Sequence, residues 1–399
     1  MTRKIYKLDG EWRIFPDPEE RGEEERIYSD KVDASKWPLI RVPGHWQEEV
    51  EQLREYTGVV WYRKNFEYHK TNRRTWLVFN GVFYKATVWL NNVKLGSHEG
   101  YFGRFAFEVT DIIKEHNVLV VKVESRDERN PNRKEQIGGI FYHWDCRDPN
   151  FNPGGIWRSV EIYDTGSVRI ERIKVMPEIM DGKAILRVKI WVDSERGETI
   201  NVTLCVKPEN FAGNQIVIRK NTVVNAGMNI LSFDVPVEDP RLWWTWDLGE
   251  QNLYTLSVEV YTDDGISDSK AVTFGIREVR FEKKRSGWRL YLNGKRLFVR
   301  GTNYGPTNQR IAYVTMDDME RDVRMMREAN INMVRIHAHI GSDILSILDR
   351  YGILAWQDFP LQWMYSRKIK KSSVQNAREF VPVSYTHLRA HETEADLVC

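Results

Sequence analysis

Three short apolar runs alternate with two amphipathic segments between residues 290 and 358. The runs cover residues 297–300, 332–336 and 353–356, and an Asn293-Gly294 turn precedes the first of them. Continuous apolar strands separated by helices are typical of a parallel sheet, because the crossover helices cover its faces. This alternation constrains the fold more than any other feature. It predicts the first part of a (β/α)8 barrel.

Both segments between these runs carry helix signals. Thr315 and Asp318 form a capping-box pattern, and the second segment has Ser342 as an N-cap and Gly352 where a left-handed C-cap residue is expected. The apolar residues at helical spacing are Met319, Val323 and Met326 in the first segment, and Ile344, Ile347, Leu348 and Tyr351 in the second. Methionines in such a stripe indicate core packing. We therefore predict two helices.

Polar and aromatic residues follow the end of each predicted strand. These residues are Asn303, Tyr304, Arg335, His337, His339, Gln357, Asp358 and Trp363. A (β/α)8 barrel carries its active site at this edge of the sheet. The pattern stops after three of the eight strands that a barrel needs, so we expect the given chain to end before the chemistry of the enzyme.

The composition limits the classes of partner. The chain has 399 residues, enough for two or three domains, and 59 Lys+Arg against 57 Asp+Glu give a formal charge of +2. This balance creates no global field that attracts nucleic acid or an anionic membrane. Residues 1–10 lack the apolar core of a signal peptide, no stretch is long enough to span a bilayer, and three cysteines give no disulfide framework. We expect a cytoplasmic location.

Two all-β segments precede the α/β pattern, at about residues 6–164 and 168–274. Asn80-Gly81 and Asn91-Asn92 tolerate positive φ and predict tight hairpins in the first segment. The second segment has an Asp263-Asp264-Gly265 turn, and its length and strand number indicate an immunoglobulin-like sandwich. The strand-like runs are 76–79, 84–90 and 118–123 in the first segment, and 184–192, 200–206 and 254–261 in the second.

The last residues, 383–399, show no apolar periodicity, and residues 383–393 resemble the translation of a sequencing adaptor. We treat this tail as non-native. His387, His391 and Glu392 would face one way on a helix, as in some zinc sites, but no third ligand or supporting fold follows them. We therefore predict no metal site there.

Short motifs in order along the chain carry a family resemblance. They are Gly10-Glu11-Trp12, Val42-Pro43-Gly44-His45-Trp46, Trp61-Tyr62-Arg63-Lys64, Phe79-Asn80-Gly81-Val82, Trp89-Leu90-Asn91-Asn92, Gly96-Ser97-His98-Glu99-Gly100, Gly155-Ile156-Trp157-Arg158, Leu253-Tyr254-Thr255-Leu256 and Phe274-Gly275-Ile276-Arg277. Their order and spacing resemble glycoside hydrolase family 2, which contains β-galactosidases, β-glucuronidases and β-mannosidases.

The resemblance implies a domain organisation. We expect a jelly-roll sugar-binding domain at residues 1–165, an immunoglobulin-like β-sandwich at 166–276, the N-terminal part of a (β/α)8 barrel at 277–382 and the non-native tail at 383–399. In this family an acid/base glutamate and a nucleophilic glutamate flank the glycosidic bond, and retention places their carboxyl groups about 5 Å apart. Both are expected beyond the end of this chain, so no catalytic residue is assigned and the fragment is expected to be inactive.

Two segments resemble the β-mannosidase-like branch of the family. Tyr142-His143-Trp144-Asp145 resembles a jelly-roll loop that reaches the barrel mouth, and Trp356-Gln357-Asp358-Phe359 resembles that branch's third-strand ending. The chain departs from the branch at Tyr304-Gly305, where a Trp-Ile pair is usual, and at His337-Ala338-His339, which replaces a glycine-rich turn. We expect a retaining exo-β-glycosidase acting on terminal β-mannosides; β-galactosidase, β-glucuronidase and a non-catalytic carbohydrate-binding protein are the alternatives.

The expected substrate-binding residues are Trp144, Asp145, Asn303, Arg335, His337, Asp358 and Trp363. Each has a plainer structural alternative. Asp145 can be a surface-loop aspartate, Asp358 a helix cap, Arg335 the partner of a neighbouring carboxylate and Trp363 a buried aromatic. His337 and His339 would face one side of an extended strand, which permits a metal pair, although hydrogen-bonding pocket residues are the expectation. We expect no cofactor.

Overall fold

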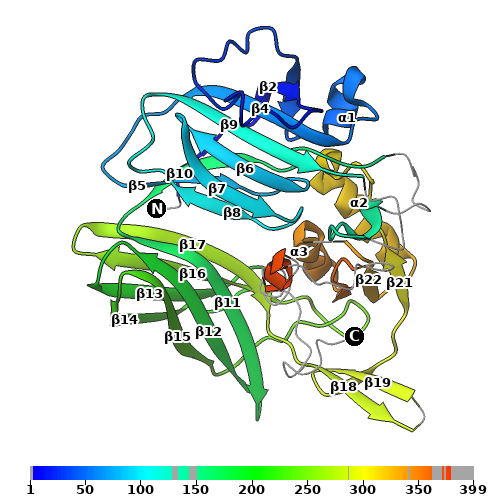
Figure 1. The fold of residues 1–399 in the computed structure, drawn as a ribbon. Helices are drawn as coiled ribbons and strands as arrows, with labels where there is room; N and C mark the ends of the chain where they lie inside the picture. Colours follow the sequence, from blue (N-terminus) through cyan, green and yellow to red (C-terminus); the bar gives the residue numbers. More distant parts are fainter. Residues whose placement is uncertain are drawn as a thin grey trace.

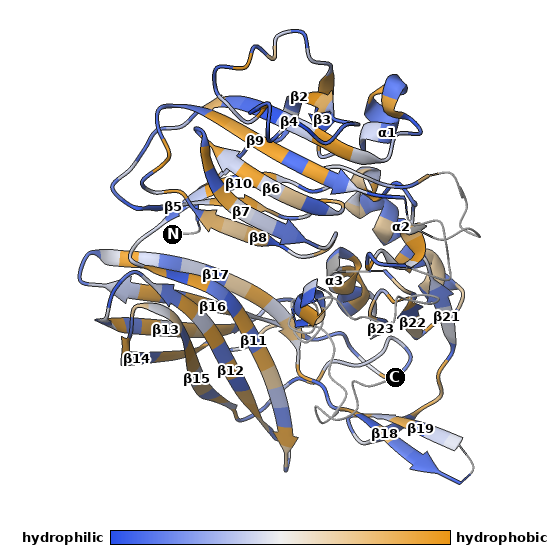
Figure 2. Ribbon diagram, viewed as in Figure 1, coloured by the Kyte–Doolittle hydropathy of each residue, from blue (hydrophilic) through white to orange (hydrophobic). Residues whose placement is uncertain are grey.

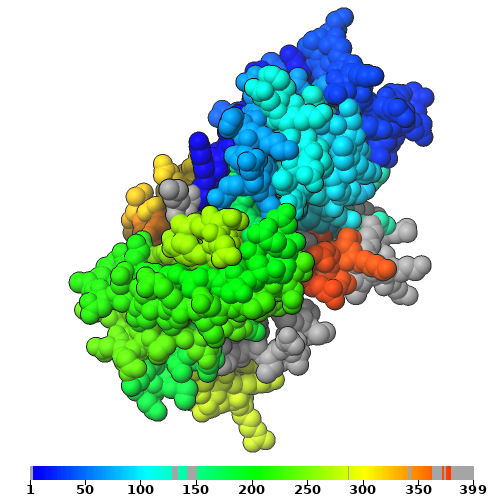
Figure 3. All heavy atoms as spheres, turned by 90° about the vertical axis from the view of Figure 1, so that its left-hand side faces the viewer, coloured from blue at the N-terminus to red at the C-terminus, as the bar shows by residue number. Residues whose placement is uncertain are grey.

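The computed structural model describes residues 3–127, 134–142, 151–285, 287–339, 342–361, 371–372 and 374–378. It contains two β-sandwiches and a smaller α/β layer that lies beside them (Figure 1). The two sandwiches pack against each other, as the space-filling view in Figure 3 also shows, and ion pairs such as Arg74–Asp193 (2.7 Å) and Arg3–Asp268 (2.6 Å) join them. The three parts thus form one packed body.

The N-terminal sandwich is a jelly roll, and its described residues form ten strands. A six-stranded antiparallel sheet has the order β3-β2-β4-β9-β6-β7, and a four-stranded sheet has the order β1-β10-β5-β8. The strands are β1 Ile5–Lys7, β2 Gly10–Pro16, β3 Leu39–Val42, β4 Gly58–Glu67, β5 Arg74–Phe79, β6 Lys85–Leu90, β7 Val93–Glu99, β8 Phe105–Glu108, β9 His116–Ser125 and β10 Val160–Thr165. Short helices lie at α1 Trp46–Glu49, η1 Glu51–Leu53 and η2 Gly139–Tyr142.

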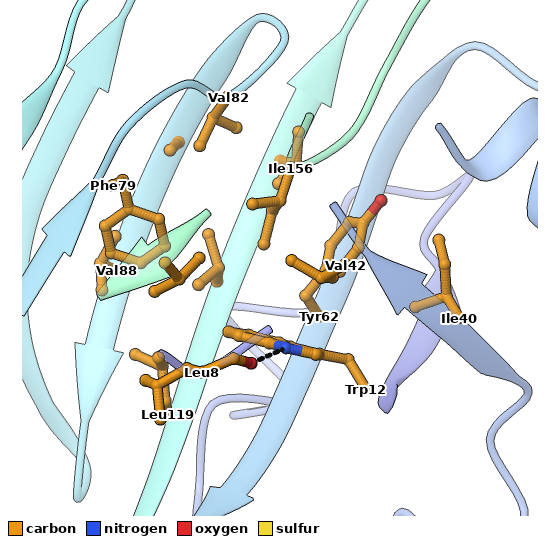
Figure 4. Close-up of a cluster of buried hydrophobic side chains, with 14 of the residues drawn as sticks. Leu8, Trp12, Ile40, Val42, Tyr62, Phe79, Val82, Val88, Leu119 and Ile156 are labelled. Atoms are coloured by element: carbon orange, nitrogen blue, oxygen red, sulfur yellow. Dashed lines mark hydrogen bonds between the residues drawn. The ribbon is translucent and has the colours of Figure 1, made fainter. Parts of the chain in front are cut away.

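The jelly-roll core lies between these two sheets. Trp12 is fully buried there, and its indole nitrogen donates a hydrogen bond of 2.8 Å to the Leu8 carbonyl (Figure 4). Tyr62, Phe79 and Leu119 pack in the same cluster. An aromatic side chain buries 150–250 Å², so these rings supply much of the burial that stabilises the domain.

One of the two predicted jelly-roll hairpins is confirmed and the other is wrong. Asn91 and Asn92 have φ of 50° and 71° and connect the paired strands β6 and β7. The Asn80-Gly81 segment makes no hairpin, because β5 and β6 belong to different sheets. Gly81 instead permits close packing, since a Cβ there would lie 2.8 Å from the Trp157 ring.

The second sandwich has the predicted immunoglobulin-like architecture, with sheets in the orders β11-β12-β15 and β14-β13-β16-β17. Its strands are β11 Val168–Met180, β12 Lys183–Ser194, β13 Glu198–Pro208, β14 Ile216–Val224, β15 Gly227–Val237, β16 Leu253–Thr262 and β17 Gly265–Gly275. Hydrophobic and hydrophilic residues alternate along several of these strands (Figure 2), as expected for sheets with one buried face. The predicted turn connects β16 to β17, with φ of +99° at Gly265.

The α/β layer confirms the predicted parallel sheet and both helices. The strands β21 Gly301–Tyr304, β22 Met333–Ile336 and β23 Leu354–Gln357 pair in parallel, and α2 Met316–Glu328 and α3 Ser342–Tyr351 connect them. The Thr315–Asp318 capping box is present. Apolar residues of both helices pack against Val334 and Ile336 of β22 in one cluster, and Gly352 has φ of +72°, as a left-handed C-cap requires.

The first predicted strand of this layer was misplaced. Residues 295–297 form β20, which belongs to a small antiparallel sheet with β18 Val279–Lys284 and β19 Gly287–Leu292. The Asn293-Gly294 turn joins β19 to β20, with φ of 48° and 78° at its two residues. The parallel strand is the next segment, β21, whose sequence Gly-Thr-Asn-Tyr has no apolar run and whose residues are mostly exposed. The search for an apolar run therefore selected residues 297–300, the segment directly before the true strand.

A loop of the second sandwich packs against the amino-terminal ends of the parallel strands. The buried Asn332 accepts a hydrogen bond from the Arg300 amide (2.9 Å) and donates to the Phe298 carbonyl (3.0 Å) and to the Asp247 carboxylate (3.1 Å). Asp247 also pairs with the Arg300 guanidinium at 2.7 Å. Trp246 donates to the Ile331 carbonyl at 2.8 Å. These contacts fix the start of β21 and β22 on the sandwich.

We predict that Asn332→Ala destabilises the amino-terminal ends of these strands by about 2–4 kcal/mol, because it removes a buried amide that makes three hydrogen bonds, to the Arg300 amide, the Phe298 carbonyl and the Asp247 carboxylate. The measurement is the opening free energy of the β22 amides by hydrogen exchange. Asn214→Ala, at an exposed position outside any strand, is the matched control and is expected to change stability by less than about 0.5 kcal/mol. Equal effects of the two substitutions would contradict the role given to Asn332.

No helix in the described ranges is long and apolar enough to cross a membrane.

Candidate functional site

The inner face of the parallel sheet is the face opposite α2 and α3. Asn303, Arg335 and Trp356 are register neighbours across the three strands. Side chains alternate along a strand, so these three share a face, while Tyr304, Val334 and Ala355 pack in the helix-covered cluster. The three shared-face residues line a cleft of about 660 Å³ together with Met333 of β22 and with residues of the small antiparallel sheet.

Two of the predicted residues, Arg335 and His337, converge on the carboxylate of a third, Asp358, at the carboxyl end of the sheet. Asp358, directly after β23, accepts from the Arg335 guanidinium at 2.7 Å (Nη2 to Oδ2) and 3.2 Å (Nε to Oδ1). The Nδ1 atom of His337 lies 3.2 Å from the same Oδ2. The side chain of Asp358 is 17% exposed, while those of Arg335 and His337 are 44% and 37% exposed. This cluster holds the two oxygens of Asp358 in a fixed orientation at the strand ends.

The backbone around the cluster explains its geometry. The amides of His337 and Asp358 donate to the carbonyls of Tyr304 (2.9 Å) and Ile336 (3.2 Å), which extends the ladder beyond the strands. Gln357 donates from its side chain to the carbonyls of His339 (2.6 Å) and Asp358 (2.8 Å). The two loops that carry the cluster are therefore bonded to each other.

The two histidines occupy different surroundings, contrary to the expectation that they face one way. Ala338 has φ of 49°, so the chain turns between them. His339 is buried beside the Tyr304 ring, and its Nδ1 lies 3.1 Å from the His337 carbonyl. Burial lowers the pKa of His339 to about 4, so its ring is neutral near pH 7. Within the described residues, no three His, Cys, Asp or Glu side chains are grouped so that they could hold a metal ion.

The jelly roll contacts the segments that follow the carboxyl ends of β22 and β23. The Ile140 amide in η2 donates to the Ala338 carbonyl at 3.1 Å, and the Phe102 and Phe359 rings meet edge to face at 6.3 Å. A buried aromatic cluster that includes Tyr101 and Trp157 surrounds this contact. Ala338, in the segment directly after β22, is therefore bonded to the N-terminal domain.

The structure thus brings together Arg335, His337 and Asp358, and it places Asn303 on the neighbouring strand beside Arg335. Trp144, Asp145 and Trp363, which were also predicted, lie outside the described residues. The described chain stops at Tyr142 of η2 and resumes at Phe151.

Trp356 is a site residue that the sequence reasoning did not select. Its ring is 53% exposed on the inner face and meets Phe281 edge to face at 6.1 Å. The register places it beside Arg335. Two-residue alternation counted back from Asp358 was the signal that could have identified it.

We predict that Gly139→Ala separates the jelly roll from the loop after β22. A Cβ at Gly139 would lie 1.8 Å from the Ala338 carbonyl oxygen, so backbone must move and the Ile140 hydrogen bond is lost. The expected cost is about 2–4 kcal/mol, measured as loss of exchange protection at Ile140 together with a lower unfolding temperature.

Gly182→Ala is the matched control, because Gly182 also has positive φ (+80°) but a Cβ there meets nothing within 4 Å. Its expected cost is only that of the left-handed conformation, about 1–2 kcal/mol. A Gly139→Ala protein that keeps wild-type protection at Ile140 would contradict the docking contact.

Protein-family models match three consecutive parts of the chain. The model "Glycosyl hydrolase 2 galactose-binding domain-like" matches residues 43–158, "Glycosyl hydrolases family 2" matches residues 168–277, and "Glycosyl hydrolases family 2, TIM barrel domain" matches residues 284–383. These regions fall in the jelly roll, in the second sandwich and in the α/β layer, in that order.

Individual glycosidases are similar in sequence to this chain over most of its length. A β-galactosidase of Thermoanaerobacterium thermosulfurigenes is 27% identical over 403 residues, which cover 96% of this chain and 52% of that protein. A β-glucuronidase of Paenibacillus borealis is 25% identical over 384 residues, covering 90% of this chain and 59% of that protein. The chain therefore spans about half the length of the curated relatives it matches.

A crystal structure of a β-D-mannosidase from Dictyoglomus thermophilum has the same fold. Its TM-score is 0.80 at 21% identity, and the match covers 96% of this chain and 51% of that chain.

Proposed function

Because the chain belongs to glycoside hydrolase family 2, we propose that it provides the sugar-binding edge of a retaining exo-β-glycosidase that cleaves terminal β-linked sugars. The observation that carries this proposal is the Asp358 carboxylate, which Arg335 and His337 orient at the carboxyl end of the parallel sheet. This is the edge where (β/α)8 barrels bind substrate.

Asp358 is suited to binding a sugar hydroxyl. Its two oxygens accept hydrogen bonds, and a bond from a hydroxyl to an ionised carboxylate is roughly twice as strong as a bond between neutral groups. Arg335 holds this carboxylate in one orientation through both of its oxygens, and the ring of His337 lies beside Oδ2, the oxygen that Nη2 of Arg335 contacts. Trp356 and Asn303 then present an apolar face and an amide beside it.

Hydrolysis with retention needs two carboxyl groups about 5 Å apart, one as nucleophile and one as acid/base. At the strand ends that the structure describes, residues 303–304, 335–339 and 357–361, Asp358 is the one carboxylate, and it is already paired with Arg335. We infer that the described part of this chain contributes binding groups and not the catalytic pair.

We predict that the chain as given does not hydrolyse aryl β-mannoside, β-galactoside or β-glucuronide. The purified protein is compared with a preparation from cells carrying an empty vector, using a release assay for the aryl group. Turnover above that blank would show that the 399 residues are sufficient for catalysis and would overturn the division of roles proposed above.

For the substrate we propose a terminal β-mannoside. The support is the Trp356-Gln357-Asp358 ending of β23 and the Trp144-Asp145 pair, which resemble the β-mannosidase-like branch. Asp145 would then supply a second carboxylate to the terminal sugar, and Trp144 and Trp363 would contact it through their rings. The β-galactoside and β-glucuronide alternatives are separated from this one by the wild-type preference among the three substrates.

The site proposal is tested by Asp145→Ala and Asp358→Ala in a protein of the relatives' full length that carries this chain. If the hydroxyl contacts tighten in the transition state, each substitution lowers kcat/KM on the preferred substrate by about 1.5–3 kcal/mol, or one to two orders of magnitude.

Asp317→Ala is the control, because Asp317 is an exposed aspartate in the first turn of α2. It is expected to leave kcat/KM unchanged. A wild-type preference for β-galactoside would refute the choice of sugar. Unchanged kinetics in both site variants would refute the site.

A further inference from the structure

Loop 305–314 leaves the carboxyl end of β21 and lies against the jelly roll. His45, the residue directly before α1, stands at the centre of this contact. The Ala312 amide donates to Nε2 of His45 at 3.3 Å, and the Nδ1 atom lies 3.3 Å from the Gly154 carbonyl. One ring thus joins the loop to the jelly-roll segment at Gly154.

These two partners determine which nitrogen carries the proton. The Gly154 carbonyl can only accept, so Nδ1 of His45 carries a hydrogen and donates. The Ala312 amide can only donate, so Nε2 carries none. A doubly protonated ring would direct an N–H group at the N–H of Ala312, and that hydrogen bond would be lost.

The surroundings of the ring also disfavour a charge. His45 is fully buried, and the rings of Phe151 and Tyr313 meet it edge to face at 5.6 and 6.1 Å. Burial, with a smaller contribution from the nearby Arg310 guanidinium, lowers the pKa of His45 from 6.5 to about 4, although the hydrogen bond to Gly154 acts in the opposite direction. The neutral ring is therefore the form that belongs to the docked loop.

The charged and titratable groups around this contact come from three elements. Glu48 and Glu49 lie on α1, Arg310 and Tyr313 lie on the loop, and Tyr62 lies on β4. Glu48 is paired with Arg310, and Glu49 accepts a hydrogen bond of 2.7 Å from the Tyr313 hydroxyl. Burial raises the pKa of both tyrosines, so they remain neutral in acid. Both carboxylates thus already have partners on the loop.

We propose that His45 is a positioning residue whose neutral ring fixes loop 305–314 on the jelly roll, and that protonation of this ring releases the loop. Because the loop leaves the carboxyl end of β21, acid would then open one side of the candidate site. This inference concerns the loop alone and does not depend on which glycoside is cleaved.

The expected change in the population of released loop follows from the linkage between protonation and docking. The docked loop needs a ring with a pKa of about 4, while a released, solvated ring has its ordinary value of 6.5. The group therefore contributes its full stabilisation above pH 6.5 and loses it progressively as the pH falls toward 4. The population with the loop released should rise by about 25-fold between pH 7.5 and pH 5.

The first test uses the unmodified chain with 15N-labelled histidine, and it needs no catalytic activity. The His45 signal, assigned from its nuclear Overhauser contacts to Tyr313, should show an Nδ1–H tautomer at pH 7.5 and no protonation of the docked ring down to pH 5. An Nε2–H tautomer, or titration of the docked ring between pH 6 and 7, would overturn the proposal.

The second test measures exchange protection of loop 305–314, corrected for intrinsic rates, from pH 7.5 to pH 5. The wild type should lose about 25-fold protection there while β4 and β9 keep theirs. His45→Gln keeps a donor and an acceptor but does not titrate, so its loop should show no such pH dependence. His116→Gln, which replaces an exposed histidine paired with Glu67, should behave as wild type.

The same pH dependence in His45→Gln and wild type would refute the role of His45. If His45→Gln fails to fold, shown by loss of protection in β4 at pH 7.5, the tautomer and titration of the wild-type ring decide the question.

Discussion

The buried amide of Asn332 and its hydrogen bonds to Asp247, Phe298 and Arg300 are the constraint on which the α/β layer depends. Three parallel strands with one face uncovered by helices have little core of their own. Asn332 fixes the amino-terminal ends of β21 and β22 on a loop of the immunoglobulin-like sandwich. The strand directions, and hence the positions of their carboxyl ends, follow from that attachment.

The jelly roll fixes the opposite ends of these strands, their carboxyl ends. Ile140 bonds to Ala338, and His45 bonds to Ala312, so two of the loops that bear on the candidate site have contacts in a different domain. The Asp358 cluster lies at this end of the sheet, and its residue His337 directly precedes Ala338 in the chain. Its geometry is therefore a property of the whole chain and not of the barrel strands alone, which is why both β-domains matter to a site that lies outside them.

Much of this arrangement could be predicted from sequence. Helical spacing and the Thr315 capping box predicted α2, and the polar residues at the carboxyl ends of β22 and β23 identified Asp358 and its two partners, because these signals are local. The position of β21 could not be predicted from the sequence, since its polar residues form a strand only by pairing with segments that are distant along the chain. The Asn80-Gly81 hairpin failed for a similar reason: Gly81 serves packing against Trp157, which follows it by 76 positions in the sequence.

The contact between Ile140 and Ala338 joins segments made far apart in time as well as in sequence. During synthesis the jelly roll leaves the ribosome long before β22 exists, and N-terminal domains generally fold first. The later strands then meet a surface that is already formed. The first domain would in this way act as a template for the edge of the sheet, and substitutions on its docking face would slow the maturation of the neighbouring layer before they altered the finished molecule.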